Sequence, residues 1–416
     1  MTRVRRLGNR SSRALAVPNF RRYFVGQGLS TIGTGMQILA QTWLVLELTG
    51  SAVQLGLAIT LQTLPVLVLG PWAGAVADRV DNRRVVLITS MTAALEATAL
   101  GLLVATHHVT VTWIWVFAGF LGVIQAFERP AGQALLYELV GPDDLPSAVG
   151  LNATLTAAGR LLGPASAAIA IATLGIAACF FANAVSFLAV IAAILAISPA
   201  TMYPRRIAHG RVRIRDGMTY AWRTPVLRRS LLAMALAGTL TYNFQQTVPA
   251  MIRFTFHHGA GALGVVQAIG GIGSVVGALA VASIVSPSIR TVGAAAVAFG
   301  AVMALAAAAP TIVLFGLIWA PCGLASAAFS ASTQALLQRR SDPEFQGRVM
   351  ALYSIAWIGT TPIGALVVGV VIDHWSARAG LAVGAAAALV AGVSVLWPRV
   401  DDASDSQISA LSTVSS

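Results

Sequence analysis

Four ionisable residues lie well inside long apolar segments of this 416-residue sequence and are the side chains best placed to do chemistry: Glu96, Glu128, Arg129 and Arg160. Arg160 lies about fourteen residues into its segment, or about 20 Å along a helix, near the middle of a bilayer. A charge at that depth is costly unless it faces a polar cavity or an opposite charge, so it marks an ion or substrate pathway. We expect Glu96 or Glu128 to be a proton carrier. The alternative is a fixed structural ion pair with Arg160.

The elements that hold these residues are a ladder of apolar segments separated by short polar turns. Hydrophobic residues make up 57% of the chain and charged residues 10%, which is far more apolar sequence than a soluble core needs. A helix needs about 20 apolar residues to cross a bilayer. The sequence therefore predicts an all-α polytopic membrane protein with twelve transmembrane helices. The predicted spans are residues 23–46, 53–77, 85–106, 110–135, 146–170, 174–198, 229–253, 261–285, 290–309, 311–337, 347–371 and 379–398.

The longest polar interruption divides this ladder into six spans on either side. It runs from Pro199 to Arg229 and carries eight arginines and one acid. The halves repeat at an offset of 201 residues, so that Gln133-Ala134-Leu135-Leu136 returns as Gln334-Ala335-Leu336-Leu337, and Gly163 as Gly364. Such a parallel repeat is the organisation of one large transporter class. The predicted domains are a tail at 1–22, a six-helix bundle at 23–198, a linker at 199–228, a second bundle at 229–398 and a disordered tail at 399–416.

Arginines indicate the orientation of this ladder. We count 23 in the tails and turns of one face, two on the other face (Arg253 and Arg378) and two inside helices. Under the positive-inside rule the rich face is cytoplasmic, so we expect both termini in the cytoplasm of a bacterial-type inner membrane. The net charge of +12 thus belongs to membrane turns, and nucleic-acid binding is not expected. The uncharged run after the basic N-terminus is too long for a signal-peptide core, which predicts an uncleaved first helix.

Residue usage excludes several classes of function. All 27 basic residues are Arg, so the chain lacks the lysine of a P-loop and the lysine of a Schiff base. We therefore expect neither a cofactor nor enzymatic activity. Cys179 and Cys322 lie in apolar segments far apart in the sequence, so no disulfide framework is predicted. The pairs His107-His108 and His257-His258 lack nearby acids or thiols, so we predict no metal site.

The most specific motif lies where the second predicted span turns into the third. It reads Gly74-Ala75-Val76-Ala77-Asp78-Arg79-Val80-Asp81-Asn82-Arg83-Arg84. We expect Gly74 to permit close helix approach and Asp81-Asn82 to adopt the left-handed backbone of a tight turn. The arginines of the motif are expected to anchor at lipid headgroups.

This loop resembles that of the major facilitator superfamily, which reads Gly-x-x-x-Asp-Arg-x-Gly-Arg-Arg between helices 2 and 3. Asp81 stands at the family's second glycine and Asn82 at one arginine. The resemblance implies two six-helix bundles around a central cavity that opens to either side in turn. It also implies that Asp78 gates this motion at the cytoplasmic start of helix 11, because a carboxylate stabilises a helix N-terminus. The alternative is a charge cluster that only sets topology.

Two further stretches extend the resemblance. Gly159-Arg160-Leu161-Leu162-Gly163-Pro164 is similar to the helix 5 motif of the superfamily's antiporters, and it favours export, with plain helix packing as the alternative. The stretch from Phe127 to Asn152 resembles the branch that contains the enterobactin exporter and macrolide efflux pumps. Gly132 occupies that branch's arginine position, and Arg129 lies about one helical turn earlier on the same face.

The resemblance implies proton-coupled efflux of a small amphipathic molecule, such as a drug or siderophore, by a monomeric carrier. The expected partners are this substrate, protons and the lipid bilayer. Neutral polar side chains of helices 1 and 7 are candidate substrate contacts, unless they only bond helices together: Gln37, Gln41, Asn243, Gln245 and Gln246. Two alternatives remain open, namely a nutrient importer of the same fold and a non-transporting membrane assembly factor or receptor.

Overall fold

The structure, a computed structural model, describes residues 13–204, 214–282 and 287–397. All regular secondary structure in these ranges is helical. The α-helices are α2 (Pro18–Thr49), α3 (Ala52–Ala77), α4 (Asn82–Ala105), α5 (Val111–Leu174), α6 (Ala177–Leu195), α7 (Ile214–Arg223), α8 (Pro225–Leu240), α9 (Phe244–Ala250), α10 (Ala260–Ala282), α11 (Ile289–Ala308), α12 (Ile312–Arg340), α13 (Gln346–Ser354), α14 (Thr361–His374) and α15 (Ala377–Leu396). Short 3-10 or π turns are η1 (Arg13–Ala16), η2 (Pro199–Thr201), η3 (Met251–Thr255) and η4 (Ile355–Gly359).

Helix α5 covers two predicted spans in a single run of 64 residues that is broken at Gly141. Gly141 has a φ of 73°, in the left-handed region that favours glycine, and a Cβ there would lie 2.6 Å from the ring of Tyr203. Pro142 follows, and proline suits the first turn of a helix. Helix therefore continues past the predicted span ends at 135 and 146, because a single glycine is enough to interrupt it.

Nine helical segments of the described chain are long and apolar enough to cross a bilayer. α5 counts once among them although it covers two predicted spans, while α2 and the pair α8 and α9 lie on predicted spans without meeting the criterion. The polytopic all-α architecture is thus present, and the number twelve stays a prediction.

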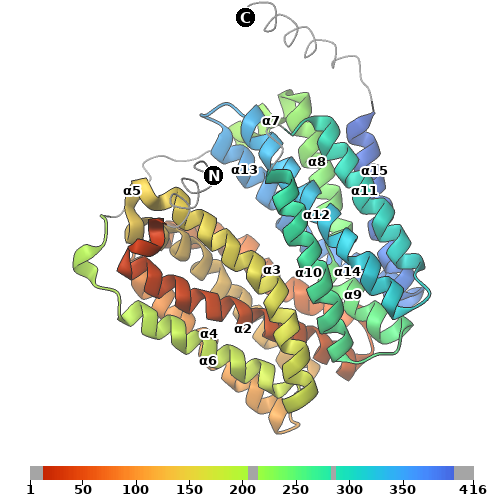
Figure 1. Cartoon of the computed structure of the whole chain (residues 1–416), viewed down its shortest axis with the longest axis horizontal. Coiled ribbons are helices and arrows are strands. Elements are labelled where there is room, and N and C mark those ends of the chain that lie inside the picture. Colours follow the sequence, from red (N-terminus) through yellow and green to blue (C-terminus); the bar gives the residue numbers. More distant parts are fainter. Residues whose placement is uncertain (1–12, 205–213, 283–286, 398–416) are drawn as a thin grey trace, which may run out of the picture.

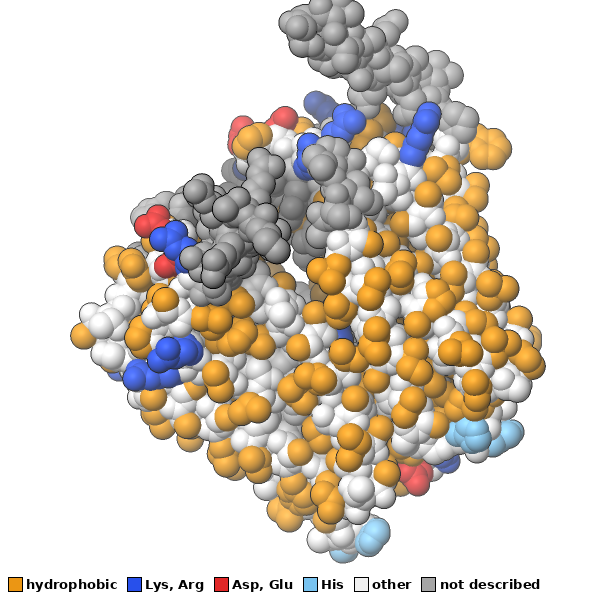
Figure 2. Space-filling view, in the orientation of Figure 1, with side chains coloured by type: hydrophobic (Ala, Val, Ile, Leu, Met, Phe, Trp, Pro, Cys, Tyr) orange, Lys and Arg blue, Asp and Glu red, His pale blue; other side chains and the backbone are white. Residues whose placement is uncertain are grey.

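The surface of the helices is apolar over most of its height. Figure 2 shows hydrophobic side chains across both halves of the molecule, with most basic side chains toward one end of this face and histidines at the other. Large apolar residues are widely exposed, among them Leu95, Ile169 and Val313. Such a surface would be a liability in water, and a bilayer covers it.

The described part of the predicted linker is mainly helical and packs on the second half. α8 begins at Pro225, before the predicted residue 229. The Tyr220 ring of α7 stacks on Phe345 with centroids 4.5 Å apart, and its hydroxyl accepts a hydrogen bond of 3.1 Å from the amide of Asp342. The linker therefore reaches the start of α13. Residues 1–12, 205–213 and 398–416, which include most of both predicted tails, lie outside the described residues.

Helices α2 to α6 and helices α8 to α15 form two groups that lie side by side in Figure 1. The repeated glycines make equivalent contacts in the two groups. A Cβ on Gly163 of α5 would lie 2.8 Å from Gly35 of α2, and a Cβ on Gly364 of α14 would overlap the carbonyl oxygen of Thr239 in α8. The sequence repeat is thus also a repeat of helix packing, and the domain boundaries remain a prediction.

Candidate functional site

Glu96 lies in a chain of polar side chains inside the first group of helices. It is 2% exposed, and both its carboxylate oxygens accept from Gln37 Nε2, at 3.2 and 3.0 Å. Gln37 Oε1 in turn accepts a hydrogen bond of 2.7 Å from Asn183. The network joins α4, α2 and α6. Gln37, an expected substrate contact, therefore forms hydrogen bonds between helices in this structure. The hydrogen bonds of Glu96 come from Gln37, whereas the sequence suggested Arg160 as its partner. The sequence analysis did not identify Asn183, which is an isolated amide in an apolar span.

Glu128 occupies a different and more open neighbourhood on α5. It is half-buried, and its carboxyl interacts with Gln27 of α2 and with the adjacent Arg129. Tyr23 of α2 also lies within electrostatic range of this carboxyl. Arg129 itself is exposed and donates a 3.0 Å hydrogen bond to Gln125 one turn earlier. The two membrane-depth acids therefore have separate surroundings, and Tyr23 and Gln27, at the start of the first span, were not foreseen.

Arg160 is exposed and is directed toward the second half of the molecule. It lies within electrostatic range of Tyr242, between α8 and α9, and of Tyr353 in α13. Beside it, a Cβ on Gly271 of α10 would be 3.1 Å from the Arg160 carbonyl oxygen. Arg160 therefore lies where the two halves face each other.

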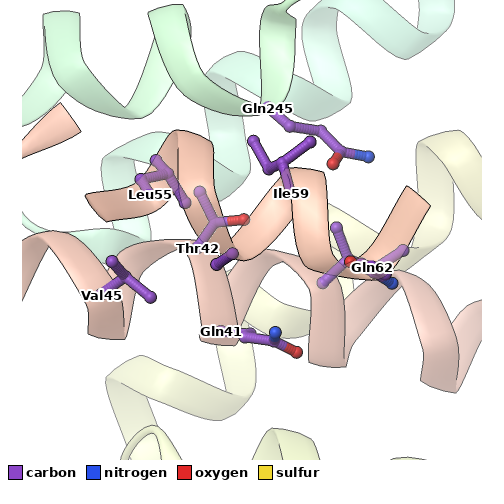
Figure 3. Close-up of a pocket in the computed structure, with 9 residues that line it drawn as sticks. Gln41, Thr42, Val45, Leu55, Ile59, Gln62 and Gln245 are labelled. Carbon is purple, nitrogen blue, oxygen red and sulfur yellow. The ribbon is translucent and has the colours of Figure 1, made fainter. Parts of the chain in front are cut away.

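A small pocket lies between α2, α3 and the segment that holds α9 (Figure 3). Three amides border it, Gln41, Gln62 and Gln245, together with Thr42 and apolar side chains. Its volume is ≈ 10 Å³, which is room for about one water molecule. The pocket is too small for a drug-sized molecule in this state of the protein.

Asn243 and Gln246 are two of the expected substrate contacts. Both side chains are buried, and their amide groups donate hydrogen bonds to backbone carbonyls. Asn243 Nδ2 donates to the Thr239 carbonyl at 2.7 Å, at the break between α8 and α9. Gln246 Nε2 donates across the two halves to the Ala52 carbonyl at 2.6 Å, and its Oε1 has no partner among the described residues. Gln41 and Gln245 are the members of the expected set that reach the pocket.

An aspartate links the two halves at one end of the molecule. We call this the histidine end, because Figure 2 shows histidine side chains there; His107 follows the end of α4, and His257 follows the end of η3. Asp373, at the end of α14, accepts hydrogen bonds from the α3 start: from Ser51 Oγ at 2.5 Å and from the amides of residues 52 and 53 at 2.6 and 3.1 Å. A carboxylate on the first amides of a 26-residue helix is a favourable charge–dipole contact. We call this contact the Asp373 latch.

The opposite end of the molecule carries the turn at 78–82 and α7, and we call it the arginine-rich end. Near the latch, α3 and α14 pack closely, since a Cβ on Gly56 would lie 2.9 Å from the Ala365 carbonyl carbon. Further along, a Cβ on Gly74 of α3, Gly150 of α5 or Gly347 of α13 would meet nothing within 4 Å. Near the latch α3 and α14 are therefore in close contact, whereas Gly74, at the other end of α3, makes no such contact.

A model of the transmembrane secretion effector family matches residues 11–414. The chain belongs to this family of the major facilitator superfamily. Helical architecture and family agree, so the predicted fold class is confirmed. As a member, the chain is a multi-pass membrane transporter of small molecules and not an enzyme. No group of three or more potential metal ligands occurs in the described ranges.

Curated relatives of this transporter carry efflux and siderophore names. The multidrug efflux pump Tap of Mycolicibacterium fortuitum is 29% identical over 88% of this chain and 93% of its own. Macrolide efflux protein A of Streptococcus pyogenes is 22% identical over 91% and 95%. The staphyloferrin A transporter of Staphylococcus aureus is 30% identical over 40% of this chain and 42% of its own.

Solved structures share the fold at low sequence identity. The nucleoside transporter NupG matches with a TM-score of 0.72 at 12% identity, covering 91% of this chain and 98% of its own. A bacterial homologue of the iron transporter ferroportin matches with a TM-score of 0.71 at 15% identity, covering 91% and 98%.

The superfamily loop is built differently from its expected form. Asp81 has a φ of −59° and is the N-cap of α4, its carboxylate accepting from the amide of Arg83 at 3.0 Å. Gly74 has open space where a Cβ would be, so in this state it serves no close helix contact. The expected left-handed turn is wrong, because N-capping by an aspartate already satisfies a free helix amide.

The charged residues of this loop have distinct positions. Arg83 donates to the last carbonyls of α6, with Nε 3.0 Å from the Ile194 oxygen, a favourable place for a cation. Arg84 lies 3.5 Å from the Asp81 carboxylate, while Arg79 is exposed. Asp78 caps the C-terminus of α3 and is exposed. Its gating role stays a prediction.

The glycines of the helix 5 motif pack against α2. A Cβ on Gly159 would lie 3.1 Å from the Thr31 carbonyl oxygen, and Gly163 meets Gly35. On another face, a Cβ on Gly264 of α10 would lie 2.6 Å from the Pro164 carbonyl oxygen. The motif therefore serves close helix packing, and its link to antiport stays a prediction.

Proposed function

We propose that this transporter exports small amphipathic molecules in exchange for protons, by alternating access between two states. The observation that carries the mechanism is the contrast between the Asp373 latch at the histidine end and the open space at Gly74, Gly150 and Gly347. With the arginine-rich end in the cytoplasm, as the positive-inside rule predicts, this is an inward-open state. The efflux names of the Tap and macrolide relatives support export.

Of the two membrane-depth acids, Glu128 is the better candidate for the proton carrier. A carrier must meet both water and a competing cation during the cycle, and Glu128 is half-buried beside Arg129. Glu96 is 2% exposed and is bonded to Gln37. We assign Glu96 to holding α2 and α4 together.

The function is tested by transport in cells that lack their own drug pumps. Expression of the transporter should lower the accumulation of fluorescent dyes and of a macrolide, and a protonophore should abolish this effect. Everted vesicles should accumulate the same compounds when a proton gradient is imposed. Gradient-driven uptake into right-side-out vesicles would instead establish the importer, and unchanged accumulation of every compound would contradict transport of this class.

The Asp373 latch and Asp78 are expected to act in opposite directions. Asp373→Asn removes the charge from the α3 start, so the state open at the histidine end should gain population. Asp78→Asn should have the reverse effect, because the carboxylate then no longer stabilises the α13 start in the opposite state. A charge at a helix terminus changes the free-energy difference between the two states by about 1 kcal/mol. This corresponds to about a 5-fold change in the ratio of their populations.

Spin labels on cysteines at positions 108 and 258 would measure this shift as a distance distribution across the histidine end. The two native cysteines are buried and are replaced by alanine. Glu47→Gln is the matched control, since Glu47 is an exposed acid at the same end with no bond to the other half among the described residues. Shifts of the same sign in Asp373→Asn and Asp78→Asn would refute the opposed gates.

A further inference from the structure

Arg160 presents a guanidinium at membrane depth without an acid beside it. Its side chain is exposed, and no hydrogen bond or ion pair joins it to another described residue. About 27 Å of helix separates it from Pro142 and about 21 Å from Leu174, so neither helix end brings it to the bilayer surface. A charge at this depth needs a counter-charge or a watery cavity.

The membrane-depth acids of the described chain do not supply that counter-charge. Glu96 is enclosed in the network of Gln37 and Asn183. Glu128 faces Arg129, Gln27 and Tyr23. The space between the halves at Arg160 is therefore electropositive in the absence of a ligand.

The second half presents aromatic rings opposite this charge. Tyr242 lies 5.9 Å from Trp357 and 5.8 Å from Phe244, and Tyr353 lies 5.8 Å from Trp357, all between ring centroids. The Tyr242 hydroxyl donates to the Ser326 carbonyl at 2.8 Å, and Tyr353 donates to the Ser330 carbonyl at 3.2 Å. Both phenol protons are thus already donated to backbone carbonyls. Among these three side chains, Arg160 is the one that can donate hydrogen bonds to a ligand.

We infer that Arg160 binds the carboxylate of an aromatic organic anion whose ring lies against Tyr242 and Trp357. A guanidinium offers two parallel N–H donors to a carboxylate, and partial removal from water strengthens the pair. Ring contacts with the aromatic wall add affinity and orient the molecule. This inference rests on the proposed transport function and specifies its substrate class.

The test uses three ligands that share one ring system and differ in charge: 1-naphthylacetate, 1-naphthylacetamide and 1-naphthylethylamine. Binding of tritiated 1-naphthylacetate to the purified full-length transporter is measured by scintillation proximity, with the other two as competitors. The wild type should bind the acid about 10-fold or more tightly than the amide. Arg160→Gln should remove this preference. Arg160→Lys should keep the preference at reduced affinity, because it retains the charge without the planar fork.

Arg290→Gln is the matched control, because Arg290 is an exposed arginine with no described bond at the start of α11. Each variant is checked by size-exclusion chromatography before binding. Equal binding of acid and amide by the wild type, absence of saturable binding, or an acid preference that survives in Arg160→Gln would overturn the inference. Efflux of dyes and of a macrolide by the same cells tests the proposed function separately. If the transporter does not prefer the aromatic acid, this efflux should still be measurable.

Discussion

Glu128→Gln is expected to abolish proton-driven transport while leaving downhill exchange of substrate. The amide resembles the protonated acid in shape and neutrality but cannot release a proton. A gradient of one pH unit is worth about 1.4 kcal/mol per proton, enough for about 10-fold accumulation by one-for-one exchange. In proteoliposomes, wild-type accumulation should approach this ratio, and that of Glu128→Gln should fall to one.

Glu96→Gln is the matched control, since it makes the same change at the acid bonded to Gln37. It should retain gradient-driven accumulation and lose about 1 kcal/mol of stability from the altered hydrogen bonds. Loss of coupling in Glu96→Gln with retention in Glu128→Gln would place the proton at Glu96. Retention in both variants and in the double variant would place coupling elsewhere.

Gly364→Leu should destabilise the folded transporter. A Cβ at this position already overlaps the Thr239 carbonyl oxygen, so α14 must move away from α8. Overpacking of this kind costs about 3 kcal/mol, because the Thr239 carbonyl belongs to the backbone and cannot rotate aside. Thermal unfolding in detergent should show a large drop in midpoint, with little folded protein recovered. Gly163→Leu, at the repeat position against Gly35, should behave in the same way.

Gly150→Leu is the control for these two variants. It makes the same change in a helix where a Cβ would meet nothing within 4 Å. The midpoint of thermal unfolding of Gly150→Leu should stay near that of the wild type. Equal losses at positions 150 and 364 would mean that added bulk, rather than close contact between α8 and α14, governs stability.

Apolar length and breakers predicted the helical architecture, and the motif from Gly74 to Arg84 predicted the family, because each is a local property of the chain. The partner of Glu96 could not be predicted in this way. Gln37 and Asn183 are distant in sequence, and their meeting depends on how three helices rotate about their axes. Sequence reasoning therefore singled out Glu96 without finding its bond to Gln37.

The break at Gly141 shows a second limit. Polar residues such as Asp143 and Asp144 resemble a loop, yet helix continues on both sides of one glycine. At Gly74 the expectation failed for another reason, since a family motif describes a transport cycle and one structure presents a single state. In the proposed cycle, we expect Gly74 to approach another helix closely only when the arginine-rich end closes.

The small pocket between α2, α3 and the segment that holds α9 has a consequence for leakage in the proposed cycle. While a carrier waits with its opposite end open, ions must not pass through the closed end. The pocket is bordered by Gln41, Gln62 and Gln245, and its ≈ 10 Å³ holds about one water molecule. Amides orient a water but neither bind nor release protons as carboxylates do. In the proposed cycle, we expect a barrier of this composition to conserve the electrochemical gradient of the cell while cargo is being loaded.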